Sequence, residues 1–436
     1  MKEEITGENL KTFRKKYQEN QQNKEIEKEI TKNGIASVCE EKNKIVDTMP
    51  KFTIELPETK RYNQKETFRC WIFAGLNFIK YNVMQNLNGK EEIFSANYIS
   101  FYDRLEKSNN LYEIIIQTPN ITFEQLHEKE IVIGGVEESG YWEYFSNIVE
   151  KYGLVPESVM PETVNNSNSS EMNQLYSEKI KKDIIDLMKA KQNGMKIETM
   201  REQKETFLQE NYNFLSKVLG EPVQEFEYEW TDNKGQEHKE KMTPRTFKEK
   251  FLTIDLKEYV AIGNIPMEQM PYERLYVKKY RKNVYGKSIQ LLNLPIKYLK
   301  QYAVAQLKEG NPVCFGCRVK VDRDRKKGIL DTNLYHYEEK LGIRRLTKTE
   351  ALKLDETLFE HVMTITGVHI LDGKIKKWKI EDSYGETIHK NGYYIMDDTY
   401  FDKYVFYVVI HKTYLSKEHQ ELLTQEPIGL ENNCPF

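Results

Sequence analysis

Cysteine is scarce in this sequence. Five cysteines in 436 residues are too few for a disulfide framework. No run of about 18 apolar residues is present, which is what a membrane-spanning helix requires. The first residues, Met1 to Ile5, also lack the apolar core of a signal peptide. We therefore expect a cytoplasmic protein in a reducing compartment, without a membrane partner, in which a free thiol can react.

An excess of charge of either sign is also lacking. The 65 Lys and Arg residues nearly balance the 68 Asp and Glu residues, which leaves a net charge of −3. Nucleic-acid-binding proteins usually carry a clustered basic excess, so nucleic acid is not expected as a partner. The glycines between residues 131 and 140 do not have the spacing of a phosphate-binding loop. No cofactor is expected, and this loop is interpreted as backbone that passes close to a neighbour.

The most informative segment present runs from residue 63 to 74 and reads N-Q-K-E-T-F-R-C-W-I-F-A. Within it, Cys70 stands where a polar turn becomes an apolar helix. A helix N-terminus favours a thiolate, the nucleophilic form of cysteine. Gln64, upstream, carries an amide able to donate to an oxyanion. The alternative is a structural cysteine that opens a core helix. The helical spacing rests on Ile72, Leu76, Ile79, Val83 and Leu87.

The remaining pattern predicts a helix-rich part followed by a strand-rich part. Ser95 is expected to cap one helix, and a helical, Lys- and Glu-rich stretch from 171 to 220 breaks near Gly194. Residues 165–170 are interpreted as a polar linker. Five segments are expected to be strands, of which 361–368 and 375–381 alternate in character, and together they predict an antiparallel sheet or half-barrel. These segments are 313–319, 361–368, 375–381, 393–396 and 404–410. Further helices are expected from Trp142, Pro244 and Pro295, and a hairpin over 223–241.

A C-x-x-C motif invites a zinc or redox interpretation. It is formed by Cys314 and Cys317. No second pair and no neighbouring histidine cluster completes a set of four ligands. Within a strand the two side chains fall on opposite faces. Burial explains the motif, and no metal site is expected.

A cysteine nucleophile needs a base, and the base needs a group that orients it. Most of the eight histidines lie in polar or charged connections, but His361 begins an apolar strand. Asp382 directly follows another strand. Two neighbouring antiparallel strands would set these residues side by side. A nucleophile on a helix start and a histidine on a later sheet form the layout of a two-lobe cysteine peptidase.

The segments that carry these residues resemble the bleomycin hydrolase/aminopeptidase C family of papain-like cysteine peptidases. That family has an N-Q-K-x-x-G-R-C-W-x-F-A segment, which residues 63–74 match. Its F-S-x-x-Y segment resembles Phe94 to Tyr98. Its D-G-G-Q-W and E-K-Y-G-V-V-P segments resemble residues 138–142 and 150–156. Further matches include 361–368 and 378–385, and the series runs in order from about residue 30 to 430.

The resemblance implies a papain-like α+β fold with two lobes and helical insertions. It implies Cys70 as nucleophile, His361 as base and later acid, and Gln64 as oxyanion donor beside the Cys70 backbone N–H. Asp382 occupies the position of the family's third residue, an Asn. Substrate would be bound by Ser139, Gly140, Trp142 and Phe436.

Five regions are expected from the pattern and the resemblance together. They are an arm (1–50), a helical lobe with the nucleophile (51–160), an oligomerisation insertion (161–290), a sheet lobe with His361 and Asp382 (291–415) and a carboxy-terminal arm toward the active site (416–436). The family forms homohexamers whose active sites face an internal chamber. Its carboxy-terminal arm lies in the cleft, where the terminal carboxylate meets the free amine of the substrate. The expected function is therefore aminopeptidase activity on peptides.

Four departures from the family pattern leave alternatives open. Asp382 replaces Asn, which is expected to raise the pKa of the histidine. Phe68 replaces a Gly, which would narrow the cleft or change the turn, and Ser139 replaces the first Gly of the substrate edge. The tail ending at Phe436 is shorter than in the family. A shorter tail would open the cleft to an endopeptidase or oligopeptidase, and a third alternative is a catalytically weakened binding particle.

Overall fold

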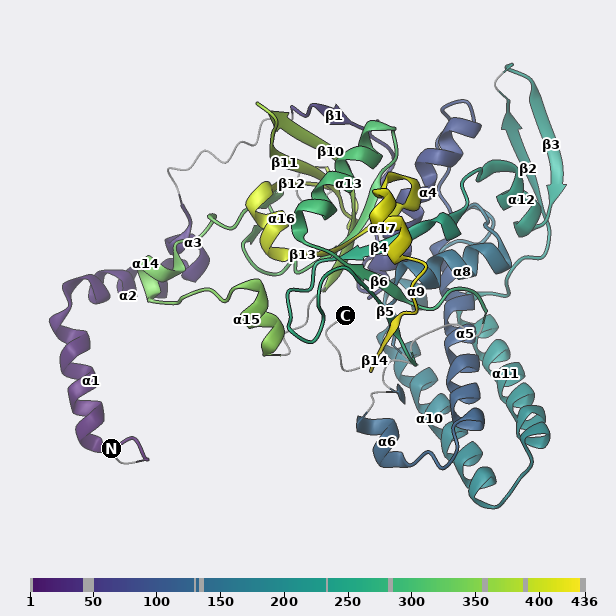
Figure 1. Cartoon of the computed structure of the whole chain (residues 1–436), viewed down its shortest axis with the longest axis horizontal. Helices are drawn as coiled ribbons and strands as arrows, with labels where there is room; N and C mark the ends of the chain where they lie inside the picture. The colour runs from purple at the N-terminus through teal and green to yellow at the C-terminus, as the bar shows by residue number, and fades with distance from the viewer. Residues whose placement is uncertain are drawn as a thin grey trace.

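The computed structural model describes residues 3–41, 51–128, 131–132, 137–232, 234–280, 285–354, 360–386 and 391–431. Among these residues, one large mixed sheet of 12 strands forms the centre of the molecule, and helices pack on both of its faces (Figure 1). This is the α+β class that the sequence predicts.

The sheet places the later strands of the chain at its centre. In order across the sheet, the strands are β14 (Ile428–Leu430), β5 (Arg274–Lys278), β6 (Gln290–Asn293), β4 (Tyr259–Gly263), β13 (Val405–His411), β7 (Val313–Cys317), β10 (His361–Leu371), β11 (Lys374–Glu381), β12 (Tyr393–Asp397), β9 (Ile329–Leu330) and β8 (Arg323–Asp324). A further strand, β1 (Ile54–Glu55), pairs with β10. The central pairs are antiparallel, as predicted.

The central strands are buried on both faces because helices cover both sides. Every residue of β7 is buried, as are the first eight residues of β10. One face packs on a core shared with α4 (Cys70–Asn86), and the other on a core shared with α13 (Ile296–Lys308). Cys314 belongs to the first core and Cys317 to the second. The two cysteines therefore lie on opposite faces of β7, as the strand pattern predicts.

The helical part is built on long helices that lie side by side. Its main members are α5 (Ala96–Gln117), α8 (Trp142–Tyr152), α10 (Ser170–Gln192) and α11 (Ile197–Leu219). Ser95 caps α5 as predicted, since its hydroxyl accepts from the N–H of Tyr98. A hairpin of β2 (Phe226–Thr231) and β3 (Glu237–Met242) follows, and α12 (Pro244–Phe251) returns the chain to the core.

Further helical segments complete the described chain. They are α1 (Gly7–Glu19), α2 (Gln21–Asn33), α3 (Ile35–Cys39), α6 (Phe123–Glu128), α9 (Val164–Ser167), η1 (Leu256–Glu258), α14 (Tyr337–Leu341), α15 (Lys348–Lys353), α16 (Asp398–Tyr404), η2 (Lys412–Tyr414) and α17 (Lys417–Leu422). No helix in the described ranges is long and apolar enough to cross a membrane.

The interpretation of residues 165–170 as a linker is wrong. They form the end of α9 and the start of α10, and Asn166 is fully buried. The polar side chains there are hydrogen-bonding partners: Thr163 caps α9, and Asn166 donates to Asn97 Oδ1. Part of the polar composition here therefore reflects capping and buried hydrogen bonds and not a linker.

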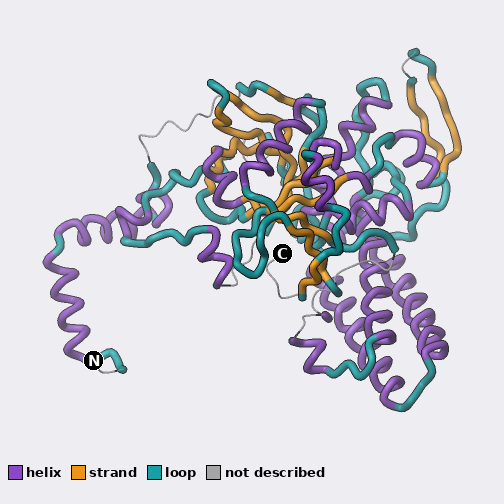
Figure 2. Tube along the Cα trace, viewed as in Figure 1, coloured by secondary structure: helices purple, strands orange, loops and turns teal. Residues whose placement is uncertain are grey.

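Two of the expected regions, the arm (1–50) and the insertion (161–290), can be compared with the fold. Helices α1 and α2 extend away from the body, as Figure 2 shows, and they bury no side chain. They meet the body through the bridge between Glu40 and Tyr335. The range 161–290 holds α10, α11 and the hairpin, but its later strands β4 and β5 pair into the central sheet. The part of this range that lies outside the sheet therefore ends before Tyr259.

Candidate active site

Cys70 is the first residue of α4 and is partly buried. Arg69, before it, provides no side-chain cap to the first N–H groups of the helix. These groups and the helix dipole favour a negative charge at this position. The helix is fixed against β10, where the hydroxyl of Thr364 donates to the carbonyl of Ala74 over 3.3 Å.

His361 and Asp382 form the second part of the site. His361 is the first residue of β10, and Asp382 directly follows the neighbouring strand β11. The imidazole Nε2 lies 2.7 Å from Asp382 Oδ1, and both side chains are almost fully buried. Because Nε2 faces Asp382, Nδ1 is the nitrogen left for Cys70. The sequence-based pairing of these two residues is thus present as a hydrogen bond.

The charge on His361 is set by its surroundings. Burial by itself would lower the pKa of the imidazole, but the Asp382 carboxylate and then Cys70 outweigh it and raise the pKa to about 10. Oδ1 of Asp382 also accepts from the N–H of Ser383 over 2.7 Å. The carboxylate is therefore held in place to stabilise an imidazolium beside the thiol.

Gln64 lies buried next to this pair, and its amide is oriented by named partners. Its Oε1 accepts from Ser383 Oγ over 2.6 Å, and its Nε2 donates to the carbonyl of Thr67 over 2.8 Å. Backbone pairing between Gln64 N–H and the Ser383 carbonyl (2.7 Å) joins the two loops. The segment before the helix and the segment after β11 therefore hold each other in register.

Tyr384 is a site residue that the sequence reasoning did not single out. Its ring stacks on His361 with centroids 5.6 Å apart, and its hydroxyl is 3.4 Å from Gln64 Nε2. It covers the imidazole on the side of the oxyanion donor. The available signal was its position two residues after Asp382, inside the 378–385 segment that matches the family.

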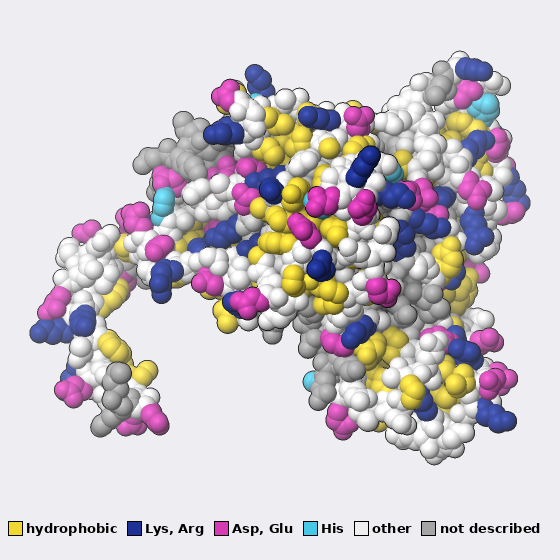
Figure 3. Space-filling model, viewed as in Figure 1, with side chains coloured by type: hydrophobic (Ala, Val, Ile, Leu, Met, Phe, Trp, Pro, Cys, Tyr) yellow, Lys and Arg dark blue, Asp and Glu magenta, His cyan; other side chains and the backbone are white. Residues whose placement is uncertain are grey.

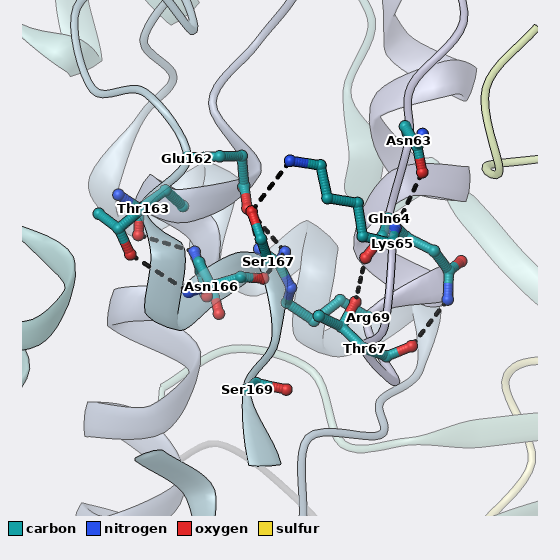
Figure 4. Close-up of polar contacts among 12 residues, drawn as sticks. Asn63, Gln64, Lys65, Thr67, Arg69, Glu162, Thr163, Asn166, Ser167 and Ser169 are labelled. Carbon is teal, nitrogen blue, oxygen red and sulfur yellow. Dashed lines mark hydrogen bonds and ion pairs between the residues drawn. The ribbon is translucent and has the colours of Figure 1, made fainter. Parts of the chain in front are cut away.

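A second loop packs against the segment that precedes Cys70, as Figure 4 shows. Buried Arg69 makes two bonds to the Glu162 carboxylate (3.0 and 2.7 Å) and one to the Asn166 carbonyl (2.5 Å). Lys65 reaches Ser167 Oγ over 3.2 Å. Since bidentate arginine–carboxylate pairs fix geometry as well as charge, these contacts immobilise the residue directly before the nucleophile.

Glu138 is a further residue that the sequence reasoning missed. Its buried carboxylate accepts from the N–H of Phe68 (2.9 Å), from Arg104 (2.7 Å) and from Ser169 Oγ (2.8 Å). Its carbonyl accepts from the indole N–H of Trp71 (2.9 Å). Burial would raise the pKa of Glu138, but Arg104, the Phe68 N–H and Arg69 outweigh it and lower the pKa. An ionised Glu138 thus joins the nucleophile segment to the 138–140 edge.

The residues expected to bind substrate have different surroundings. Ser139 is exposed, and its carbonyl accepts from buried Lys107 over 2.7 Å. Gly140 passes so close to Trp71 that an added Cβ would lie 2.4 Å from the indole Cε2, which agrees with the expected close approach. Trp142 is buried in the core against Phe78, with ring centroids 5.0 Å apart. Core packing therefore explains a tryptophan at this position without a role in substrate binding. Phe436 lies outside the described residues.

The structure shows the backbone conformation and the exposure of Phe68, which replaces a Gly of the family pattern. It is not among the described non-glycine residues with positive φ, so the turn before Cys70 needs no left-handed residue at this position. Its side chain is 76% exposed. The Phe68 side chain therefore extends into solvent from a backbone conformation that does not require glycine.

The arrangement is suited to acyl transfer through a thiol. A cysteine at a helix start, a histidine held by a carboxylate and an oriented amide are the groups that nucleophilic acyl transfer requires. The C-x-x-C thiols are different, because burial raises the pKa of both Cys314 and Cys317. Across the described ranges, no group of three or more His, Cys, Asp or Glu side chains is placed to hold a metal ion.

Comparison with known proteins places this geometry in a family. The model of the Peptidase C1-like family matches residues 4–436. Aminopeptidase C of Listeria monocytogenes serovar 1/2a is 35% identical over 99% of this chain and 98% of its own length. Aminopeptidase G of Lactobacillus delbrueckii subsp. lactis is 34% identical over 99% of this chain and 98% of its own length.

A solved structure is also similar over the full length. The crystal structure of PepW from Lactobacillus rhamnosis HN001 superposes with a TM-score of 0.93 at 35% identity, covering 99% of this chain and 98% of PepW. The expected α+β fold with papain-like relatives and the cysteine-type aminopeptidase class are therefore confirmed. The chain belongs to the Peptidase C1-like family, within which its full-length relatives are aminopeptidases of the aminopeptidase C type.

Proposed function

We propose that Cys70 is the nucleophile of this cysteine aminopeptidase and that His361, Asp382 and Gln64 act with it. The observation that carries the proposal is the 2.7 Å bond between His361 Nε2 and Asp382 Oδ1, next to a cysteine at the start of α4. The raised pKa of His361 favours an imidazolium beside a thiolate, which is the reactive form of a cysteine–histidine pair.

The reaction follows from these positions. The Cys70 thiolate attacks the carbonyl carbon of the peptide bond, and a C–S bond forms while the carbonyl oxygen becomes an oxyanion. Gln64 Nε2 and the Cys70 N–H donate to that oxygen. His361 Nδ1 gives its proton to the leaving nitrogen, and the C–N bond breaks to leave a thioester. A water molecule, deprotonated by His361, then attacks the thioester and releases the acid and the thiolate.

The position of the cleaved bond in the peptide is proposed from the names of the relatives. Their names describe aminopeptidases, so we propose removal of single residues from the amino termini of peptides, in the cytoplasm, by a homohexamer. An endopeptidase with an open cleft is the alternative, and a weakened binding particle is the third.

A pair of reporters separates these functions. A peptide reporter with a free amino terminus and the same reporter acetylated are compared, with Cys70→Ala as the inactive control. Loss of cleavage on acetylation is expected. Equal or better cleavage of the acetylated reporter would support the endopeptidase, because no free amine would then be needed.

The binding particle has its own signature. Wild-type protein that cleaves neither reporter, and whose Cys70 does not react with iodoacetamide near neutral pH, would support it. Size measurement in solution tests the hexamer, for which a monomer or dimer at micromolar concentration would be the contrary result.

A further inference from the structure

The side of the site that receives the leaving group is bordered by Tyr384. In the proposed reaction His361 protonates the leaving nitrogen, so the residues that follow the scissile bond must pass beside His361. The Tyr384 ring stacks on that imidazole with centroids 5.6 Å apart, and its hydroxyl is 3.4 Å from Gln64 Nε2. The side chain directly after the scissile bond would therefore lie close to Tyr384.

Arg325 adds a positive charge at the same place. Its guanidinium carbon is 4.6 Å from the centre of the Tyr384 ring, a cation–π contact. Arg325 is exposed and lies in the turn that joins β8 to β9. That turn is held by antiparallel pairing of Arg323 with Leu330 and of Asp324 with Ile329. A short turn and a stacked ring thus hold an exposed guanidinium beside the leaving-group side.

Among the described residues, no acid forms an ion pair with Arg325. Asp324, the adjacent carboxylate, accepts instead from the N–H of Lys327 (2.9 Å) and lies 3.4 Å from Lys327 Nζ. The turn is strongly basic, since residues 323–327 read R-D-R-K-K. The guanidinium therefore keeps its donors available to a ligand at the cleft.

We propose that Arg325 is a specificity-determining residue that binds a carboxylate on the leaving portion of the peptide. This inference rests on the proposed function and adds a substrate class to it. The carboxylate has two sources: an Asp or Glu side chain directly after the scissile bond, or the terminal carboxylate of a dipeptide. Arginine suits both, because its planar fork binds a carboxylate through two parallel N–H bonds.

Two peptide pairs test the two sources. For the side chain, kcat/KM is measured on Leu-Asp-Ala-amide and Leu-Asn-Ala-amide. For the terminal carboxylate, it is measured on Leu-Ala and Leu-Ala-amide. The wild type is expected to prefer the charged member by about two- to fivefold, the range for an exposed ion pair. Each enzyme is judged by its own ratio between the two peptides, so any loss of folded protein cancels.

Three variants test whether the preference for the charged peptide depends on Arg325. Arg325→Gln should bring the preference close to one, and Arg325→Glu should reverse it. Lys326→Gln, an exposed cation in the same turn, should keep the wild-type preference. Raising the salt to about 0.5 M should weaken the preference, because exposed charges are screened.

The outcomes separate this inference from the function beneath it. A change in either ratio in Arg325→Gln, without one in Lys326→Gln, supports the proposal and identifies the source of the carboxylate. Unchanged ratios with active enzyme, or an equal change in Lys326→Gln, would overturn it while the proposed function stands. Wild-type enzyme that cleaves no peptide of either pair would overturn both.

Discussion

His361 Nε2 and Asp382 Oδ1 lie 2.7 Å apart, although 21 positions separate the two residues in the sequence. The contact exists because β10 and β11 are neighbouring antiparallel strands, paired from Thr364 with Glu381 onward. The end of one strand is thereby brought beside the start of the other. An ionised partner at this position makes the imidazole more basic than a neutral amide would.

Asp382→Asn should move the alkaline limb of activity to lower pH. The carboxylate holds the pKa of His361 above its ordinary value, so in the wild type the imidazolium persists as pH rises. A neutral amide removes this attraction, and the imidazolium then loses its proton about one to three pH units earlier. The measurement is kcat/KM as a function of pH on a free-amine reporter.

Asp186→Asn serves as the control for that experiment. Asp186 is a partly exposed carboxylate on α10 that pairs with Lys182, so its loss should leave the pH profile in place. An alkaline limb that does not move in Asp382→Asn would show that the carboxylate does not set the protonation of His361.

Much of this fold follows from local pattern in the sequence. Ser95 as a cap and Cys70 at a helix start are set by neighbouring residues, and both are present. The late segments are strands as predicted, but most of them are buried continuously and do not alternate. The His361–Asp382 pair was also accessible, because adjacent strands in an antiparallel sheet bring their ends together. The general assembly of the site therefore depends on short-range signals and on one strand pairing.

Glu138 and Asn166, whose roles the sequence did not predict, act through contacts between segments that are distant in the sequence. Glu138 reads as one acid in a polar loop, yet it holds Phe68, 70 residues away in sequence, through a backbone N–H. Asn166 looked like part of a linker, because polar side chains that serve as buried partners resemble exposed ones in composition. Such roles depend on which loops meet in space, which only the tertiary structure specifies.

The side chains on the exterior do not reveal these internal contacts. In Figure 3, acidic and basic side chains alternate over the body, with scattered apolar groups between them. Apolar side chains on the extended α1 include Leu10 and Phe13, which are 54% and 56% exposed. Mixed charge of this kind on the visible face agrees with the near-zero net charge of the sequence.

Glu138→Gln should lower both activity and stability. The neutral amide leaves the buried guanidiniums of Arg104 and Arg69 without their shared negative partner, and loss of one member of a buried pair costs about 3–5 kcal/mol. It also weakens the hold on Phe68, two residues before the nucleophile. Measured at a temperature where the variant is folded, kcat/KM should fall at least about tenfold, since displacement of a reacting group is costly.

Glu137→Gln is the matched control for Glu138. Glu137 is exposed and contacts Ser139 Oγ over 3.1 Å, so both its activity and its melting temperature should stay near those of the wild type. Full activity in folded Glu138→Gln would show that the Phe68 contact does not position the nucleophile.

Gly140→Ala should damage the cleft through a steric clash. The new Cβ would lie 2.4 Å from Trp71 Cε2, so either the indole that follows Cys70 or the 138–140 edge must shift. Overpacking of this kind typically costs about 1–3 kcal/mol, and activity should fall with stability. Gly7→Ala is the control, since nothing lies within 4 Å of its added Cβ. Thermal melting and kcat/KM are measured together, and a Gly140→Ala protein that matches Gly7→Ala in both would refute the clash.

Gln64 and Ser383 should behave as a donor and the group that aims it. Gln64→Ala removes a side-chain donor from the oxyanion and should lower kcat by roughly 10²–10³-fold. Ser383→Ala removes only the 2.6 Å bond to Gln64 Oε1, so the amide can rotate, and a smaller loss is expected. Since both act on one oxygen, the double variant should be no slower than Gln64→Ala alone. Steady-state kinetics on one reporter decide this, and losses that simply multiply in the double variant would mean that Ser383 acts independently of Gln64.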